Sequence, residues 1–224
     1  MGKNTKIAVM NSKIFNIDCR QCDRLSSFLD EVKLEYPGYH CLPVPPFGDP
    51  EARLLIVGLA PGKHGANASG RPFTGDHAGI LLYETLFEYG FSTAPVSTSA
   101  DDSLRLLDCR ISNAVKCLPP ENKPTTKEIR TCIQFIQHEI DEMAENSVIL
   151  ALGSIAHNAV LWSKGLKPAS FKFAHGSQYQ IAPGITLLSS YHCSRYNTQT
   201  RRLTPPMFKS IFETARNLLE AKSG

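Results

Sequence analysis

The sequence predicts an α/β fold of three layers (α/β/α), with helices on both faces of a central, mainly parallel sheet. Short apolar runs alternate with longer amphipathic segments along the 224 residues, and Pro or Gly stands at several of their boundaries. The 42% hydrophobic content is enough to bury one sizeable core. We therefore expect a single domain over residues 1–224, with residues 1–50 as an irregular N-terminal arm.

The first half of the domain opens with a strand. Residues 53–59 form a β-branched apolar run that stops at Pro61 and Gly62, which predicts a buried strand. Residues 78–91 place apolar side chains at helical spacing and end near Gly90, which predicts a helix packed on the sheet. Residues 111–115 are expected to form the second strand.

The second half repeats the alternation. Residues 126–144 predict a long amphipathic helix, with Thr125 or Thr126 at its start and Glu128 in its first turn. We expect a strand over 148–152, a helix over 154–162, a strand over 185–190 and a closing helix over 205–221 with proline near its start.

Polar residues follow the ends of these strands. Asp76 lies in the loop after the first strand, Asn113 near the end of the second, and His192 just after the last. Because the carboxyl ends of parallel strands meet at one edge of a sheet, we expect these three side chains to gather there.

The composition limits where the protein acts and what it binds. No apolar segment reaches the length of a signal peptide or of a bilayer span, so a cytoplasmic protein is expected. The net charge is only +3, yet Glu213 is the only acid between Asn146 and Thr214, a stretch that holds seven Lys and Arg residues. This basic third predicts an anionic partner, unless acids elsewhere in the fold neutralise it.

Cysteine spacing suggests a metal or cluster site. A reducing compartment disfavours disulfides, and Cys19 and Cys22 form a C-x-x-C pair that could share one metal or cluster edge. Cys117 and Cys132 are candidates for two further ligands, or are buried small hydrophobes. Spacing alone allows both zinc and iron–sulfur.

The loop from Gly58 to Asp76 is rich in glycine. It lacks the G-K-[ST] ending of a phosphate-binding P-loop and the G-x-G-x-x-G dinucleotide pattern. It offers close backbone approach together with His64, Phe73 and Asp76, which favours a flat aromatic ligand.

At this point the motifs resemble those of the uracil-DNA glycosylase superfamily and, within it, family 5, the type B enzymes. The resemblance covers about residues 19–215 and is carried by Gly58-Leu-Ala-Pro61, His64-Gly65, Asn67, Gly70-Arg71, Phe73-Thr-Gly-Asp76, Asn113-Ala-Val-Lys-Cys117-Leu-Pro-Pro120, Ser190-Tyr-His192, Asn197, Thr200 and Arg202-Leu-Thr204. It implies a glycosylase fold and hydrolysis of the N-glycosidic bond of uracil, and of other deaminated bases such as hypoxanthine, after the base is flipped out of DNA.

The resemblance also implies roles for single residues. Asp76, His192 and Asn113 would be catalytic: Asp76 would orient water and stabilise the sugar cation, His192 would donate to the departing base, and Asn113 would pair with its edge. Phe73 would stack on the base, and the other substrate-binding positions would be Gly58, Ala60, Pro61, Gly62 and His64. DNA would be bound by Arg195, Asn197, Arg201 and Arg202, and a [4Fe-4S] cluster by Cys19, Cys22, Cys117 and Cys132. A monomer is expected.

The chain departs from the family pattern in three places. Cys193 stands where proline usually follows the histidine, Arg201 replaces the glycine of Thr-Gly-Arg, and Ala68-Ser69 replaces the more common Arg-Thr. These changes bear on loop rigidity and substrate range.

Other interpretations stay open from the sequence. Asp76 could serve only as a helix N-cap and His192 only as a buried core histidine. The protein could be a DNA-binding scaffold without catalysis, a zinc-stapled hydrolase of a small metabolite, or a uracil-only family 4 enzyme, although that family expects an acid where Leu59 stands.

Overall fold

The structure is a computed structural model that describes residues 15–221. Six strands form one sheet in the order β1-β3-β2-β4-β6-β5. The four central strands, β3 (Cys109–Asn113), β2 (Leu54–Gly58), β4 (Ser147–Leu152) and β6 (Ile185–Ser190), are parallel to one another. The edge strands β1 (Phe47–Gly48) and β5 (Gln178–Ala182) are antiparallel. The predicted mainly parallel sheet is confirmed.

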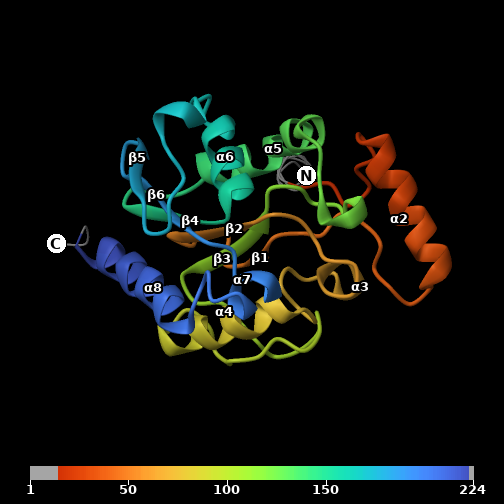
Figure 1. Cartoon of the computed structure of the whole chain (residues 1–224), viewed down its shortest axis with the longest axis horizontal. Helices are drawn as coiled ribbons and strands as arrows, with labels where there is room; N and C mark the ends of the chain where they lie inside the picture. The colour runs from red at the N-terminus through yellow and green to blue at the C-terminus, as the bar shows by residue number, and fades with distance from the viewer. Residues whose placement is uncertain (1–14, 222–224) are drawn as a thin grey trace, which may run out of the picture.

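Helices cover both faces of the sheet, which confirms the three predicted layers (Figure 1). The helices α4 (His77–Glu88) and α8 (Pro205–Glu220) pack on one face, and α5 (Thr126–Asp141) and α6 (Ser154–Ser163) pack on the other. Side chains alternate along β2 and so pack into two cores: Leu54 and Ile56 pack on the face covered by α4 and α8, whereas Leu55 and Val57 pack on the face covered by α5 and α6.

The predicted elements are found with small shifts at their ends. The second strand ends at Asn113, so Ala114 and Val115 begin the next loop. Helix α5 begins with a capping box, in which Glu128 N donates to Thr125 Oγ1 and Thr125 N donates to the Glu128 carboxylate.

The prediction of an irregular arm is wrong for the described part of residues 1–50. Helix α2 (Asp23–Glu35) lies in this segment, and β1 joins the sheet edge. The helix forms because Leu25, Leu29 and Val32 follow one helical face and are buried. Residues 1–14 of the arm lie outside the described residues.

Two short helices and two 3₁₀ turns complete the described chain: α3 (Ala66–Ser69), α7 (Arg195–Gln199), η1 (Pro120–Asn122) and η2 (Pro168–Ser170). Among residues 15–221, no helix combines the length and the apolar content needed to cross a bilayer.

Candidate active site

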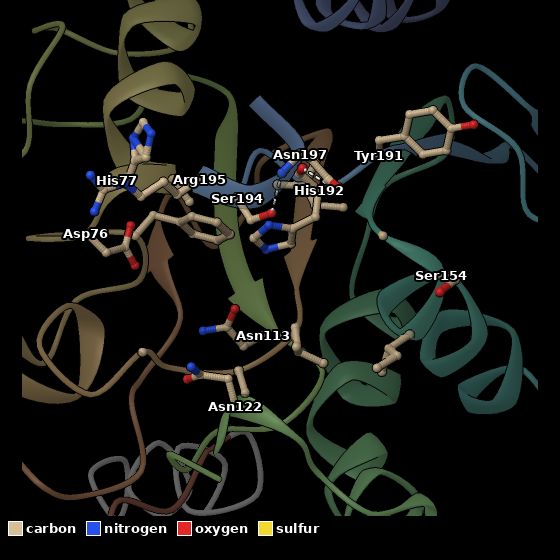
Figure 2. A pocket seen from close by; sticks show the side chains of 18 of the residues that line it. Asp76, His77, Asn113, Asn122, Ser154, Tyr191, His192, Ser194, Arg195 and Asn197 are labelled. Carbon is tan, nitrogen blue, oxygen red and sulfur yellow. Dashed lines mark hydrogen bonds between the residues drawn. The ribbon is translucent and has the colours of Figure 1, made fainter. Parts of the chain in front are cut away.

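A cavity of about 500 Å³ opens at the carboxyl edge of the sheet. Asp76, Asn113 and His192 all line it, although Asn113 ends β3 and the other two lie after β2 and β6 (Figure 2). The prediction that the parallel strands bring these side chains together is confirmed. Ala60, Gly62, Phe73, Arg195, Asn197 and Arg202 also line the cavity.

Four predicted residues lie outside the cavity lining. Gly58 lies behind it, where an added Cβ would come within 2.4 Å of Asn113 Oδ1 and 2.7 Å of the Phe73 ring. Glycine at this position therefore lets both side chains approach the strand end. Pro61 is buried, Arg201 is exposed, and His64 points to the arm, where its Nδ1 lies 2.9 Å from Tyr39 Oη.

Phe73 forms one wall of the cavity. Its ring lies 5.9 Å from the His192 ring at an interplanar angle of 26°. Its φ of +54° is uncommon for a residue with a side chain, and such a conformation costs on the order of 1–3 kcal/mol. Tyr83 Oη donates to the carbonyl of the neighbouring Pro72 at 2.9 Å, which helps to hold the loop in this shape.

Asn113 ends strand β3 and is 3% exposed. Its amide points into the cavity (Figure 2) and makes no hydrogen bond to another group among residues 15–221. Because the amide faces the cavity, it is available to pair with a ligand that offers one donor and one acceptor.

His192 is held by the loop that follows β6. Asn197 Nδ2 donates to the His192 carbonyl at 2.8 Å, and His192 Nδ1 is buried without a partner in the described chain. Burial lowers the pKa of His192 to about 4, so the imidazole is neutral at pH 7. A neutral ring carries one N–H donor and one acceptor.

Asp76 caps helix α4 and also faces the cavity. Its Oδ1 accepts from Gly79 N at 2.9 Å, which confirms the N-cap geometry considered from the sequence. Burial raises the pKa of the Asp76 carboxyl, and the backbone N–H groups of Gly79 and Ala78 oppose that shift. A Cβ at Gly65 would lie 2.8 Å from Asp76 Oδ2, so this glycine leaves the carboxylate its space.

Sequence reasoning missed several lining residues. Gly153 and Ser154 follow β4, and the carboxyl-edge rule that found the other loops would also have indicated them. Asn122 reaches the cavity from the short 3₁₀ turn η1 and Phe173 from an irregular segment, where periodicity carries no signal.

The exposed rim of the cavity is basic. Arg195, Arg201 and Arg202 are exposed, and none of them forms an ion pair with another group among residues 15–221. The guanidinium of Arg202 lies 4.8 Å from the centre of the Tyr191 ring. By contrast, Lys164 and Lys209 of the same basic third are paired with Asp141 and Glu88, so only part of that charge is available to a partner.

The altered family positions have different surroundings, and Arg201 adopts a φ of +56°, in the left-handed region that glycine favours. Cys193 is fully buried in the core beside helix α8, and burial together with the charge of Asp76 raises the pKa of its thiol. Ser69 helps to close the loop that carries Phe73, since its Oγ lies within hydrogen-bond distance of the Gly65 and Thr74 carbonyl oxygens, at 3.1 and 3.2 Å.

The four predicted cluster cysteines gather around a second, small hollow. Cys19, Cys22, Cys117 and Cys132 all line it, and Lys116 N donates to Cys132 Sγ at 3.3 Å. Burial, together with the other thiols, raises the pKa of Cys117 to about 12, and burial raises that of Cys132 to about 11. Within residues 15–221, no group of three or more His, Cys, Asp or Glu side chains is arranged to hold a single metal ion.

An α/β fold with a ring-stacking wall and a free amide at the carboxyl edge of its sheet defines a protein built to bind a flat heterocyclic ring. A family model described as "Uracil DNA glycosylase superfamily" matches residues 45–216. The chain belongs to this superfamily and, within it, to the type-5 uracil-DNA glycosylase family.

The similar proteins support this assignment across the chain. A type-5 uracil-DNA glycosylase of Thermus thermophilus is 47% identical over 205 residues, which cover 89% of this chain and 93% of the relative. The type-5 enzyme of Pyrobaculum aerophilum is 39% identical over 89% of this chain and 88% of its own length. A type-4 enzyme of Archaeoglobus fulgidus is 29% identical over 88% of both chains, so type 5 is the better description.

Proposed function

We propose that the protein hydrolyses the N-glycosidic bond of uracil in DNA and thereby starts base excision repair. The single observation that carries this proposal is the cavity that unites Asp76, Asn113 and His192 with the Phe73 ring. The names of the similar type-5 enzymes support the same reaction.

Base recognition would use two of these residues. A base in a duplex must be unstacked before a pocket can reach it, and an aromatic wall compensates part of that loss. Phe73 offers the ring, and the Asn113 amide offers one acceptor and two donors to the edge of uracil.

Cleavage would use the other two. As the bond from C1′ to the base breaks, its electron pair leaves with the base, and the neutral His192 ring donates a hydrogen bond to the base oxygen. A preorganised donor of this kind contributes about 3 kcal/mol. Water then attacks C1′, the Asp76 carboxylate stabilises the sugar cation, and the water proton passes to that carboxylate.

DNA would lie across the basic rim as a substrate of a monomeric enzyme. Arg195, Arg201 and Arg202 are free to contact phosphates, whereas Asn197 acts through the His192 backbone. Tyr196, next to Arg195, is 70% exposed, so its ring is available to stack where the base has left the helix.

The hollow lined by four cysteines would hold a [4Fe-4S] cluster. Four thiol donors and a backbone N–H directed at one sulfur fit such a group. Bound iron would lower the raised pKa values of these thiols and tie the arm to the β3–α5 segment.

The cluster has a test that is independent of activity. Anaerobically purified protein should be brown and hold four iron atoms, and Cys19→Ser should lose the broad visible absorbance. Cys109→Ser is the matched control, because Cys109 lies in the core on the other face of the sheet from the four. Stoichiometric zinc without iron would contradict the cluster and favour a zinc staple.

Hypoxanthine would be a second substrate, because a cavity of about 500 Å³ leaves room for a purine. Single-turnover excision from labelled duplexes with uracil or hypoxanthine, followed by alkaline cleavage, tests both activities. We expect abasic product from both. Product from uracil alone would remove the purine activity, and no product from iron-loaded protein would favour the DNA-binding scaffold.

A further inference from the structure

A second groove lies beside the base cavity and has no role in the chemistry described above. It encloses about 570 Å³, and Ile80, Val96, Ser97 and Gln199 line it in addition to residues that it shares with the base cavity. We call it the flank groove. Phe73, Asp76, His77 and Arg195 line both hollows, so the two lie next to each other.

The flank groove combines an apolar wall with a free cation. Ile80 and Val96 are each 58% exposed and border the same groove. Arg195 lies between the two hollows and forms no ion pair among the described residues. A nucleotide has matching chemistry, with an anionic phosphate next to an apolar sugar and base face.

The outer wall of the flank groove is fixed before any ligand binds. Arg71 is 5% exposed, and its Nη1 donates to Ser97 Oγ at 3.0 Å and to Asp102 Oδ1 at 2.5 Å. Ser97 Oγ also lies 2.8 Å from Thr74 Oγ1, next to Phe73. These contacts tie the loop that carries Val96 to the loop that carries the stacking ring, so the two walls hold their spacing.

We propose that the flank groove binds the nucleotide next to the flipped one on the same strand, an inference that rests on the proposed function. The strand that enters the base cavity must continue past its mouth, where Arg195 connects the two hollows. Arg195 holds the phosphate between the two nucleotides, and Ile80 and Val96 pack against the neighbouring sugar and base. The enzyme therefore reads the sequence context of the lesion on one side.

The test is a binding cycle with five-nucleotide single strands. A 2′-fluorinated deoxyuridine, which resists hydrolysis, stands at the centre. In two further strands, the 5′ or the 3′ neighbour is replaced by a propanediol phosphate, which keeps the phosphates but removes the sugar ring and base. Each strand is titrated against the wild type, Ile80→Ser/Val96→Ser and the control Leu34→Ser, whose side chain is 84% exposed on α2.

Replacing either the 5′ or the 3′ neighbour by propanediol phosphate should weaken binding of the strand to the wild type and to Leu34→Ser roughly tenfold, and only one of the two sides should show this loss. The magnitude corresponds to burial of about 55 Å² of apolar surface. The double variant should bind the intact strand about tenfold more weakly than the wild type does. Replacement of the same neighbour should not weaken its binding any further. Equal losses in wild type and double variant on both sides would overturn the subsite while leaving uracil excision intact. A wild type that excises no uracil would overturn the proposed function, and the subsite with it.

Discussion

The substitution Asp76→Asn separates the two roles that Asp76 combines in the structure. The Asp76 Oδ1 that accepts from Gly79 N at 2.9 Å would be replaced by an amide oxygen that accepts equally well, because Asn and Asp are comparable N-caps. The negative charge, in contrast, is lost. A carboxylate about 4 Å from a sugar cation, at an effective dielectric constant of about 20, contributes about 4 kcal/mol.

That energy corresponds to about a 10³-fold slower single-turnover excision of uracil. The melting temperature of Asp76→Asn should stay close to that of the wild type. Asp76→Ala is the matched control, because it removes both charge and cap: its rate should fall similarly, and its stability should fall by about 1 kcal/mol. The rates are measured with labelled uracil duplexes and the stabilities by thermal melting. Excision by Asp76→Asn within about threefold of wild type would refute the catalytic role and leave only the cap.

Three further perturbations test the titration of His192, the DNA-binding rim and the buried charges. Because burial lowers the pKa of His192 to about 4, its imidazole should stay neutral from pH 8 down to about 5 and take up a proton only near pH 4. In the unfolded chain the imidazole binds a proton near pH 6.5. This group therefore makes the free energy of unfolding fall as the pH drops from about 6.5 toward 4. Imidazole NMR shifts report the titration, and a His192 midpoint near 6.5 would contradict the burial. Arg195→Ala and Arg201→Ala should each reduce the slope of log DNA affinity against log salt concentration by about one. The control Arg130→Ala, which loses a cation stacked on Trp162 of α6, should leave the slope unchanged. An unchanged slope in both rim variants would remove the rim from the DNA interface. Lys116→Met removes the ammonium that lies 3.0 Å from the buried Glu139 carboxylate. Unfolding by urea should show that the free energy of unfolding falls by about 3 kcal/mol, and the loss is limited because Arg110 keeps its contact with Glu139. A loss below about 1 kcal/mol would show that the pair stabilises the fold little.

The sequence predicts the central part of the fold because periodicity and chain breaks act locally there. Strand β2 is a continuous apolar run followed closely by the pair Pro61-Gly62, and α5 carries its own capping box. Because parallel strands share one carboxyl edge, strand order in the sequence is enough to predict that Asp76, Asn113 and His192 lie together there.

The elements that were missed depend on partners far along the chain or on weak patterns. Strand β5 is an edge strand, defined by its pairing with β6. Helix α2 was missed although Leu25, Leu29 and Val32 gave the signal, because its N-cap residue, Cys22, makes no side-chain cap.

The site could be predicted only in part from the sequence. The sequence pattern could not show that His64 contacts Tyr39 of the arm instead of the cavity, since that contact joins residues 25 positions apart. The pattern also could not show that Phe73 adopts a positive φ, which the surrounding loop imposes.

The central claim is that the residues around this cavity direct water to C1′ and release an intact base. The most direct measurement is excision from a uracil duplex in ¹⁸O-labelled water, with mass spectrometry of both products. The account predicts free uracil without label and an abasic sugar that has gained one ¹⁸O atom. Labelled uracil, or an abasic strand without label, would contradict hydrolysis of the N-glycosidic bond.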